Sequence, residues 1–229
     1  MIAAFLRWLG YGLCHQLPER SFFGGALQLP VCARDTGSYM GFAMAFLLIV
    51  ALDRERRSSE LPPAWLGVWL GVGLLSAAVD GATQLFGLRE STNALRLATG
   101  LAMGFAIAAY TVPLLNSQLW RRPGAGRVLG GPGQGVAYLA ALPAAFAVLW
   151  WAGPRAGVIY AIAVGASIVM TFASVNLVLV ALLPPFDQRA SCKREILVAV
   201  FLAIVVSFAE LAVAASVRGF LLGLAGAVS

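Results

Sequence analysis

The residue types best suited to chemistry are concentrated near the start of the chain, in a polar block within an otherwise apolar sequence. Cys14, His15, Cys32 and Asp35 include the single histidine and two of the three cysteines of the protein. Two thiolates, an imidazole and a carboxylate form a ligand set that suits zinc, and Cys32 and Asp35 have the C-x-x-D spacing of a ligand pair. The pattern therefore predicts a Zn²⁺ site formed by these four side chains.

A disulfide and a purely structural role are the alternatives to this metal site. If the block faces an oxidising compartment, Cys14 and Cys32 could form a disulfide and leave Cys192 as a free thiol in a reducing compartment. Otherwise the block holds free buried thiols beside a structural histidine. Adjacent residues on a regular helix point about 100° apart, so Cys14 and His15 could both be ligands only if the helix ends there, which Pro18 favours.

A second polar group is expected around residues 80–96. Asp80 and Gln84 are separated by four residues, which places them on the same face of a helix. Farther along, one face of the expected helix carries polar side chains at its start and glycines in its later turns. Its members are Arg89, Asn93, Arg96, Gly100 and Gly104. Glu90 and Ser91 belong to the same polar stretch. This arrangement is typical of a polar site at the mouth of a helix pair.

Arg96 is the residue of this group that most needs a partner. At about 1.5 Å rise per residue it lies roughly 10 Å inside the expected bilayer boundary, where an unpaired charge is costly. One alternative is a structural pair with Glu210, which has a similar expected depth in the last apolar segment. The other is a site for an anion or a lipid headgroup, favoured by two arginines with Asn and Ser side chains.

The count of charges places a condition on an anion site. Arg89 and Arg96 are roughly balanced by three acidic residues, Asp80, Glu90 and Glu210. An added anion is therefore expected only if some of these acids pair elsewhere or are protonated.

Membrane-spanning helices are the elements that must position both polar groups. Of the 229 residues, 60% are hydrophobic and 11% are charged. Because a bilayer requires backbone groups to be satisfied internally, we predict an all-α, polytopic transmembrane helix bundle. About six spans of sufficient length are expected, at residues 37–52, 63–86, 91–115, 135–152, 156–183 and 196–217. Residues 1–13 are short for a span and predict an interfacial or partly inserted helix.

The loops are short, which predicts a single integral membrane domain over residues 1–229. We expect an N-terminal helix and polar loop at residues 1–36, the six-helix bundle at 37–217 and a C-terminal tail at 218–229. The formal charge of +6 does not predict a nucleic-acid partner, because the basic residues form no continuous stripe with interleaved aromatic side chains.

The distribution of basic residues predicts the topology. They cluster in alternate loops, as Arg54, Arg56 and Arg57, then Arg121, Arg122 and Arg127, then Arg189, Lys193 and Arg194. By the positive-inside rule, these three loops are expected on the cytoplasmic side of the membrane. The block at residues 14–35, the turn at residues 80–89 and the turn at residues 153–155 then lie together on the extracytoplasmic side.

Two segments carry a family resemblance. CHQLPERSFFGG, followed by LPVCARDTGSYMGF, resembles the signature of a family of prokaryotic membrane proteins known as a domain of unknown function, and DGATQLFGLRESTNALRLATGLAMG resembles its second signature. Members of the family often carry a cysteine where this chain has Asp35. The second segment is also similar to the VanZ-like pattern, at Gln84, Arg89, Ser91, Asn93, Gly100 and Gly104. That resemblance implies a glycopeptide- or envelope-associated membrane protein.

These observations predict an extracytoplasmic site, supported by a metal, for an anionic lipid or a lipid-linked envelope intermediate. The binding group is expected to comprise Gln84, Arg89, Ser91, Asn93, Arg96 and Glu210. Asp80 or Glu90 would act as acid or base, and the metal would be structural with four protein ligands or catalytic with an open position. The alternatives are a small transporter with a path lined by Arg96 and Glu210, and a non-catalytic scaffold with a disulfide between Cys14 and Cys32.

Overall fold

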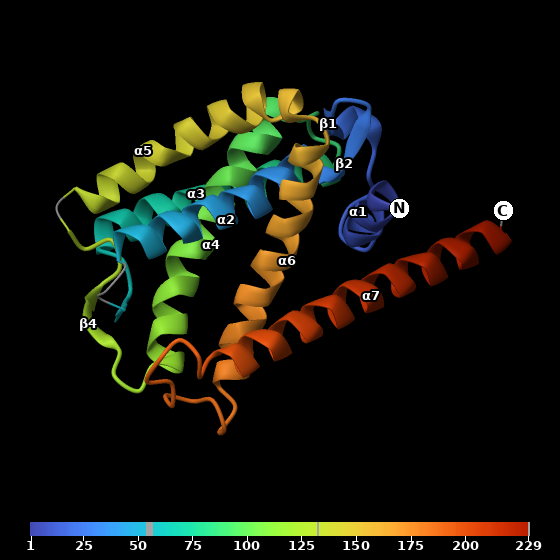
Figure 1. Ribbon diagram of the computed structural model, residues 1–229. Helices are drawn as coiled ribbons and strands as arrows, with labels where there is room; N and C mark the ends of the chain where they lie inside the picture. The colour runs from blue at the N-terminus through green and yellow to red at the C-terminus, as the bar shows by residue number, and fades with distance from the viewer. Residues whose placement is uncertain (54–56, 132, 229) are drawn as a thin grey trace.

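The computed structural model describes residues 1–53, 57–131 and 133–228, and these form a mostly helical membrane-protein fold (Figure 1). Six helices are long and apolar enough to cross a membrane. They are α2 (Ala33–Leu52), α3 (Ala64–Leu85), α4 (Asn93–Leu119), α5 (Gln134–Ala147, continued by a π-helical turn at Val148–Ala152), α6 (Val158–Ala181) and α7 (Leu197–Val228). A short helix, α1 (Ile2–Tyr11), precedes them. The predicted bundle with a short N-terminal helix is therefore confirmed.

Helices α2 and α4 form the centre of the bundle, and glycines bring their backbones into contact. A Cβ atom on Gly100 of α4 would lie 2.1 Å from the carbonyl oxygen of Arg34, and one on Gly104 would lie 2.3 Å from that of Ser38. A Cβ atom on Gly37 of α2 would likewise lie 2.5 Å from the carbonyl oxygen of Leu97 in α4. Small residues at such spacing allow the close helix packing that membrane interiors favour. The contact therefore fixes the first turn of α2 against the first turns of α4.

A β-hairpin connects the N-terminal segment to α2. Strand β1 (Ser21–Gly24) pairs antiparallel with β2 (Leu27–Cys32), with Ser21 opposite Cys32. Gly25 adopts a φ of +63° in the turn, a conformation that costs glycine little. The sequence predicted a polar loop here, and the hairpin is an addition to that prediction. It packs against α1 and α6, and its contacts are largely nonlocal, which is why helical patterning did not indicate it.

The three basic loops lie together at the other end of the bundle. Strand β3 (Ser58–Glu60) pairs in parallel with β4 (Gly124–Arg127), and the backbone N–H of Arg121 donates to the carbonyl of Ala190. Arg54 and Arg56 of the first loop lie outside the described residues. The grouping of these loops at one end is confirmed, because α2, α3 and α4 each have one terminus there and one at the polar block. Which end faces the cytoplasm stays a prediction.

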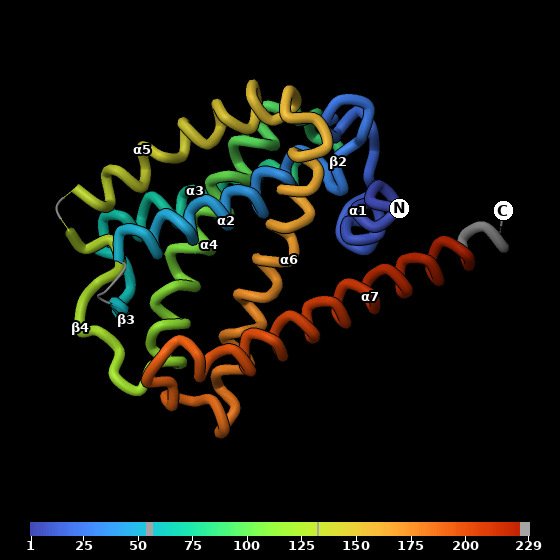
Figure 2. The backbone as a smooth tube through the Cα atoms, viewed as in Figure 1, coloured from blue at the N-terminus to red at the C-terminus, as the bar shows by residue number. Residues whose placement is uncertain are grey.

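Helix α7 is longer than the sequence indicated. It continues to Val228, through most of the segment 218–229 that was assigned to a tail. Its first half packs on α6, and its second half extends away from the bundle beside α1 (Figures 1 and 2). Arg218 donates hydrogen bonds to the carbonyl oxygens of Tyr11 and Cys14. The last helix therefore reaches the polar block from the side.

Candidate functional site

Cys14, Cys32 and Asp35 form a compact cluster. Their ligand atoms all lie within 4.8 Å of one another, so the cluster could hold a metal ion. The N–H of Cys32 donates to Sγ of Cys14 at 3.3 Å, and Sγ of Cys32 donates to Oδ2 of Asp35 at 3.2 Å. Cys14 follows α1, Cys32 ends β2, and Asp35 lies in the first turn of α2. The hairpin therefore brings a thiol from the N-terminal segment to the start of a spanning helix.

His15 does not belong to this cluster, contrary to the expected set of four ligands. Among the described residues, the grouped ligand atoms come from Cys14, Cys32 and Asp35 alone, and the side chain of His15 is exposed. The N–H groups of Leu13 and Cys14 both donate to the carbonyl of Gly10, so the chain keeps a helical turn up to Cys14. Consecutive side chains on such a turn diverge by about 100°, which directs His15 elsewhere.

The two thiols of the cluster differ in their protonation. A hydrogen bond with the side chain of Cys32 lowers the pKa of the Cys14 thiol below its usual range. The same hydrogen bond, with burial and the nearby Asp35 carboxyl, raises the pKa of the Cys32 thiol. Cys14 is therefore the first of the two to ionise.

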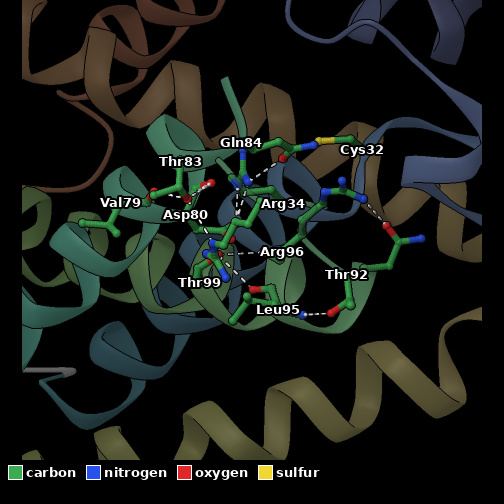
Figure 3. Close-up of polar contacts among 12 residues, drawn as sticks. Cys32, Arg34, Val79, Asp80, Thr83, Gln84, Thr92, Leu95, Arg96 and Thr99 are labelled. Atoms are coloured by element: carbon green, nitrogen blue, oxygen red, sulfur yellow. Dashed lines mark hydrogen bonds and ion pairs between the residues drawn. The ribbon is translucent and has the colours of Figure 1, made fainter. Parts of the chain in front are cut away.

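Asp80 connects the two polar groups that the sequence placed at the same end. Its side chain is only 1% exposed and forms ion pairs with Arg34 and Arg89, each with an N–O distance of 2.5 Å. Arg34 also donates to Oε1 of Gln84 at 3.1 Å (Figure 3). The polar block and the 80–96 segment are thus neighbours, as predicted.

Arg34 is the residue that sequence reasoning missed. The charge balance considered Arg89 and Arg96 and left out the arginine next to Asp35. Arg34 lies in the first turn of α2, at the same expected depth as Asp80, and this shared depth could have predicted their ion pair. Since Arg34 and Arg89 share one carboxylate, the site contains more positive charge than the sequence indicated.

Arg96 is buried without a carboxylate partner in the described part of the chain. It is 7% exposed, and Nη1 donates to Oδ1 of Asn93 at 2.8 Å. Asn93 in turn donates to the carbonyl of Glu19 at 3.1 Å, which joins the start of α4 to the polar block. The ion pairs of the described residues involve Asp80 and Glu60 as the acids. Arg96 therefore has only a neutral amide as its acceptor.

Glu210 is not the partner of Arg96. Oε2 of Glu210 accepts a hydrogen bond from Nδ2 of Asn176 at 2.7 Å, on the exposed side of α7. The same amide donates to Ser207 at 3.0 Å. The alternative of a structural pair between Arg96 and Glu210 is therefore wrong, since neither residue pairs with the other in the described part of the chain. A transport path lined by both stays a prediction. Similar depth along two helices did not imply proximity, because α7 packs mainly on α6.

A basic cavity of about 180 Å³ lies beside the thiol–carboxylate cluster. Its polar lining consists of Arg20, Arg34, Arg96, Gln84, His15, Cys14, Cys32 and Asp35. Three guanidinium groups thus face one carboxyl group. Helices α2 and α4 both begin here, so their N-terminal dipoles add positive potential. The cavity is suited to an anionic group.

The remaining predicted residues lie around this cavity or apart from it. Asp80 pairs with Arg34, which lines the cavity, and with Arg89. Asn93 accepts a hydrogen bond from Arg96. The hydroxyl of Ser91 is buried and has no hydrogen-bond partner among the described residues, whereas Glu90 is exposed. Catalytic and binding roles for all of these residues stay predictions.

The spans and the buried polar cavity define a polytopic integral membrane protein. The chain belongs to the DUF2085 family of predicted membrane proteins, which matches residues 14–110, from the first cysteine of the cluster to the middle of α4. The family resemblance of the two sequence segments is thereby confirmed. The likeness to the VanZ pattern is not tested and stays a prediction.

Two relatives are archaeal proteins described as uncharacterized. One, from Methanocaldococcus jannaschii, is 37% identical over 110 residues, which cover 48% of this chain and 68% of that protein. The other, from Methanothermobacter thermautotrophicus, is 37% identical over 99 residues, which cover 43% of this chain and 84% of that protein. No solved structure matches the chain.

Proposed function

We propose that this membrane protein binds the phosphate-like headgroup of an anionic lipid, or of a lipid-linked envelope intermediate, in the basic cavity. A zinc ion held by Cys14, Cys32 and Asp35 supports the site. The observation that carries the proposal is Arg96, which is buried at the end of a spanning helix, lines the cavity and lacks a carboxylate partner among the described residues.

The balance of charge supports an anionic ligand. Three arginines, Arg20, Arg34 and Arg96, line the cavity with one carboxyl group, that of Asp35, and the nearby Asp80 is shared by Arg34 and Arg89. The surroundings of two other acids support an anionic ligand, since Glu210 accepts a hydrogen bond from Asn176 and Glu90 is exposed. A buried guanidinium without a counter-charge is costly, and a phosphate group that accepts from several N–H donors would offset that cost.

The place of the cavity in the fold favours a lipid-borne anion over a free one. The cavity lies where α2 and α4 begin and α3 ends, at the level expected for headgroups. On the cytoplasmic side of membranes, basic pockets between spanning helices bind anionic lipid headgroups, and the same attraction between opposite charges would act in this cavity. The VanZ-like resemblance of residues 84–104 supports an envelope-associated ligand. The extracytoplasmic placement follows from the positive-inside rule and belongs to the proposal.

The donor set of the cluster fits zinc. Two thiols and a carboxyl are ligands that zinc accepts, and three protein ligands leave one coordination position for another group. Bound zinc would supply a Lewis acid beside the cavity. Asp80 is held between two arginines and is better placed to position Arg34 than to exchange protons with a ligand, so we propose binding as the function.

Lipid copurification tests the ligand. Protein purified in mild detergent is compared with the Arg96→Gln variant by mass spectrometry of bound lipids, with Arg155→Gln as a matched control that removes an exposed arginine outside the cavity. We expect anionic lipids to be depleted only in Arg96→Gln. Equal lipid content in all three proteins would contradict the proposal.

Elemental analysis tests the metal. We expect about one zinc per chain in the wild type and in Cys192→Ser, since a site of this ligand set binds one ion. Cys32→Ser should lose the zinc, whereas His15→Ala should retain it, because His15 is outside the cluster. Zinc at the same level in Cys32→Ser, or its absence from the wild type, would exclude the metal.

A further inference from the structure

We propose that Cys14 and Cys32 form a dithiol–disulfide site that exchanges with small anionic disulfides, which reach it through the basic cavity. The inference shares the cavity and the thiols of the proposed function, and it rests on that function only for the preference for anions. The formation of a disulfide between the two cysteines stands independently of lipid or zinc binding.

The positions of the two sulfur atoms support this site. They lie within 4.8 Å of each other, although the residues are far apart in sequence and belong to different elements. The β1–β2 hairpin and its packing on α1 hold both segments in place. Both cysteines line the cavity and are free thiols in the structure. The two sulfur atoms are therefore near enough for a small movement to bring them to bonding distance.

The hydrogen bonds assign an order to the exchange. Sγ of Cys14 accepts the N–H of Cys32 at the start of α2, whereas Sγ of Cys32 donates to Asp35. A sulfur that accepts an amide at a helix N-terminus is suited to attack, so Cys14 is the first nucleophile. Cys32 is the second nucleophile, because its thiol keeps the proton that it donates to Asp35.

The exchange balances as two successive substitutions at sulfur. The Cys14 sulfur attacks a disulfide R–S–S–R, the S–S bond breaks, and one R–S group leaves as a thiol with a mixed disulfide on Cys14. The Cys32 sulfur then attacks Cys14, which releases the second R–SH and leaves a disulfide between the two cysteines. The protein dithiol loses two electrons and two protons, and the small disulfide gains them. Asp35 is placed to carry the proton of Cys32.

The lining of the cavity selects the class of disulfide. Arg20, Arg34 and Arg96 surround the approach to the sulfur atoms, and the volume of about 180 Å³ admits only the part of a disulfide that adjoins its S–S bond. Positive potential in a confined site raises the rate of encounter with anions. Oxidised glutathione, which carries carboxylates, is therefore a suitable probe. Oxidation would also remove both thiolate ligands, so zinc would leave the site.

The test follows the thiols in the detergent-purified Cys192→Ser protein. Oxidised glutathione should convert Cys14 and Cys32 into an intramolecular disulfide, seen as loss of both maleimide-reactive thiols without an adduct. In the same background, Cys32→Ser should accumulate a glutathione adduct on Cys14, and Cys14→Ser should not react. Two thiols that stay free, separate adducts on both cysteines, or an adduct confined to Cys32 would overturn the inference.

A comparison of an anionic with a neutral disulfide tests the preference of the site for anions. Oxidised glutathione is measured against neutral hydroxyethyl disulfide, and the ratio of the two rates is the readout. We expect Arg96→Gln to lower this ratio about tenfold and Arg155→Gln to leave it unchanged. An unchanged ratio in Arg96→Gln would overturn the anionic class. Thiol exchange without bound lipid or zinc would overturn the proposed function alone, and bound lipid and zinc without exchange would overturn this inference alone.

Discussion

Asp80 and Glu210 are both carboxyl groups inside candidate membrane spans, yet their surroundings differ. Asp80 is 1% exposed and held by two arginines, one from α2 and one from the segment between α3 and α4. Glu210 lies on the exposed side of α7 and accepts from the amide of Asn176. The first belongs to a charged network beside a cavity. The second belongs to a contact between two helices, for which a neutral donor is sufficient.

The difference explains why we propose a ligand site at one of these places and not at the other. Around Asp80, positive charge exceeds negative charge. The buried Arg96, which lines the cavity, is the positive group that has no carboxylate partner among the described residues. Around Glu210, hydrogen bonds with Asn176 and Ser207 join α6 to α7. Buried charge in excess favours a ligand of opposite sign, whereas a satisfied polar contact favours helix packing.

The largest expected effect is that of Asp80→Asn on stability. The change leaves Arg34 and Arg89 without their shared carboxylate, and breaking such a buried pair costs about 3–5 kcal/mol. Thermal unfolding in detergent measures the loss. If Asp80→Asn unfolds at the wild-type temperature, the charged network does not stabilise this end of the bundle.

Binding of an anionic lipid should stabilise the protein through Arg96. At a lipid concentration about 100 times the dissociation constant, linkage predicts a gain of about 2.7 kcal/mol for the wild type. Arg96→Gln should gain much less, because its excess charge has been removed. Unfolding in micelles with phosphatidylglycerol, compared with phosphatidylcholine, is the measurement. The same gain in both proteins would mean that the lipid acts elsewhere.

Gly100→Ala should weaken the packing that supports the site. The new Cβ would lie 2.1 Å from the carbonyl oxygen of Arg34, so α2 and α4 must separate, at a cost of about 1–3 kcal/mol. Gly219→Ala is the matched control, since a Cβ there meets no atom within 4 Å. Equal unfolding temperatures for the two variants would argue against the close approach of α2 and α4.

The smallest effect is expected at Glu210. Glu210→Gln keeps an oxygen that accepts from Asn176, so stability should change by less than about 1 kcal/mol. Its lipid and zinc content should equal that of the wild type. A loss of bound lipid in this variant would show that Glu210 and the cavity belong to one site.

The amino-acid sequence by itself was enough to predict the spanning helices and the shared end of the two polar groups. Apolar length is a local property, and short loops between spans determine which connections lie at the same end. The proximity of Cys14, Cys32 and Asp35 followed from the small number of soft ligands in the chain. These features depend on residue type and on order along the chain.

The tertiary structure decided which side chains meet. The pairing of Arg34 with Asp80, the absence of His15 from the cluster and the position of Glu210 on α7 depend on how each helix is rotated about its axis. The hairpin depends on contacts between β2 and distant helices. Hydrophobic periodicity indicates which face of a helix is apolar, but it does not identify the neighbour of that face. The net positive charge of the cavity therefore became evident only once the helices were packed.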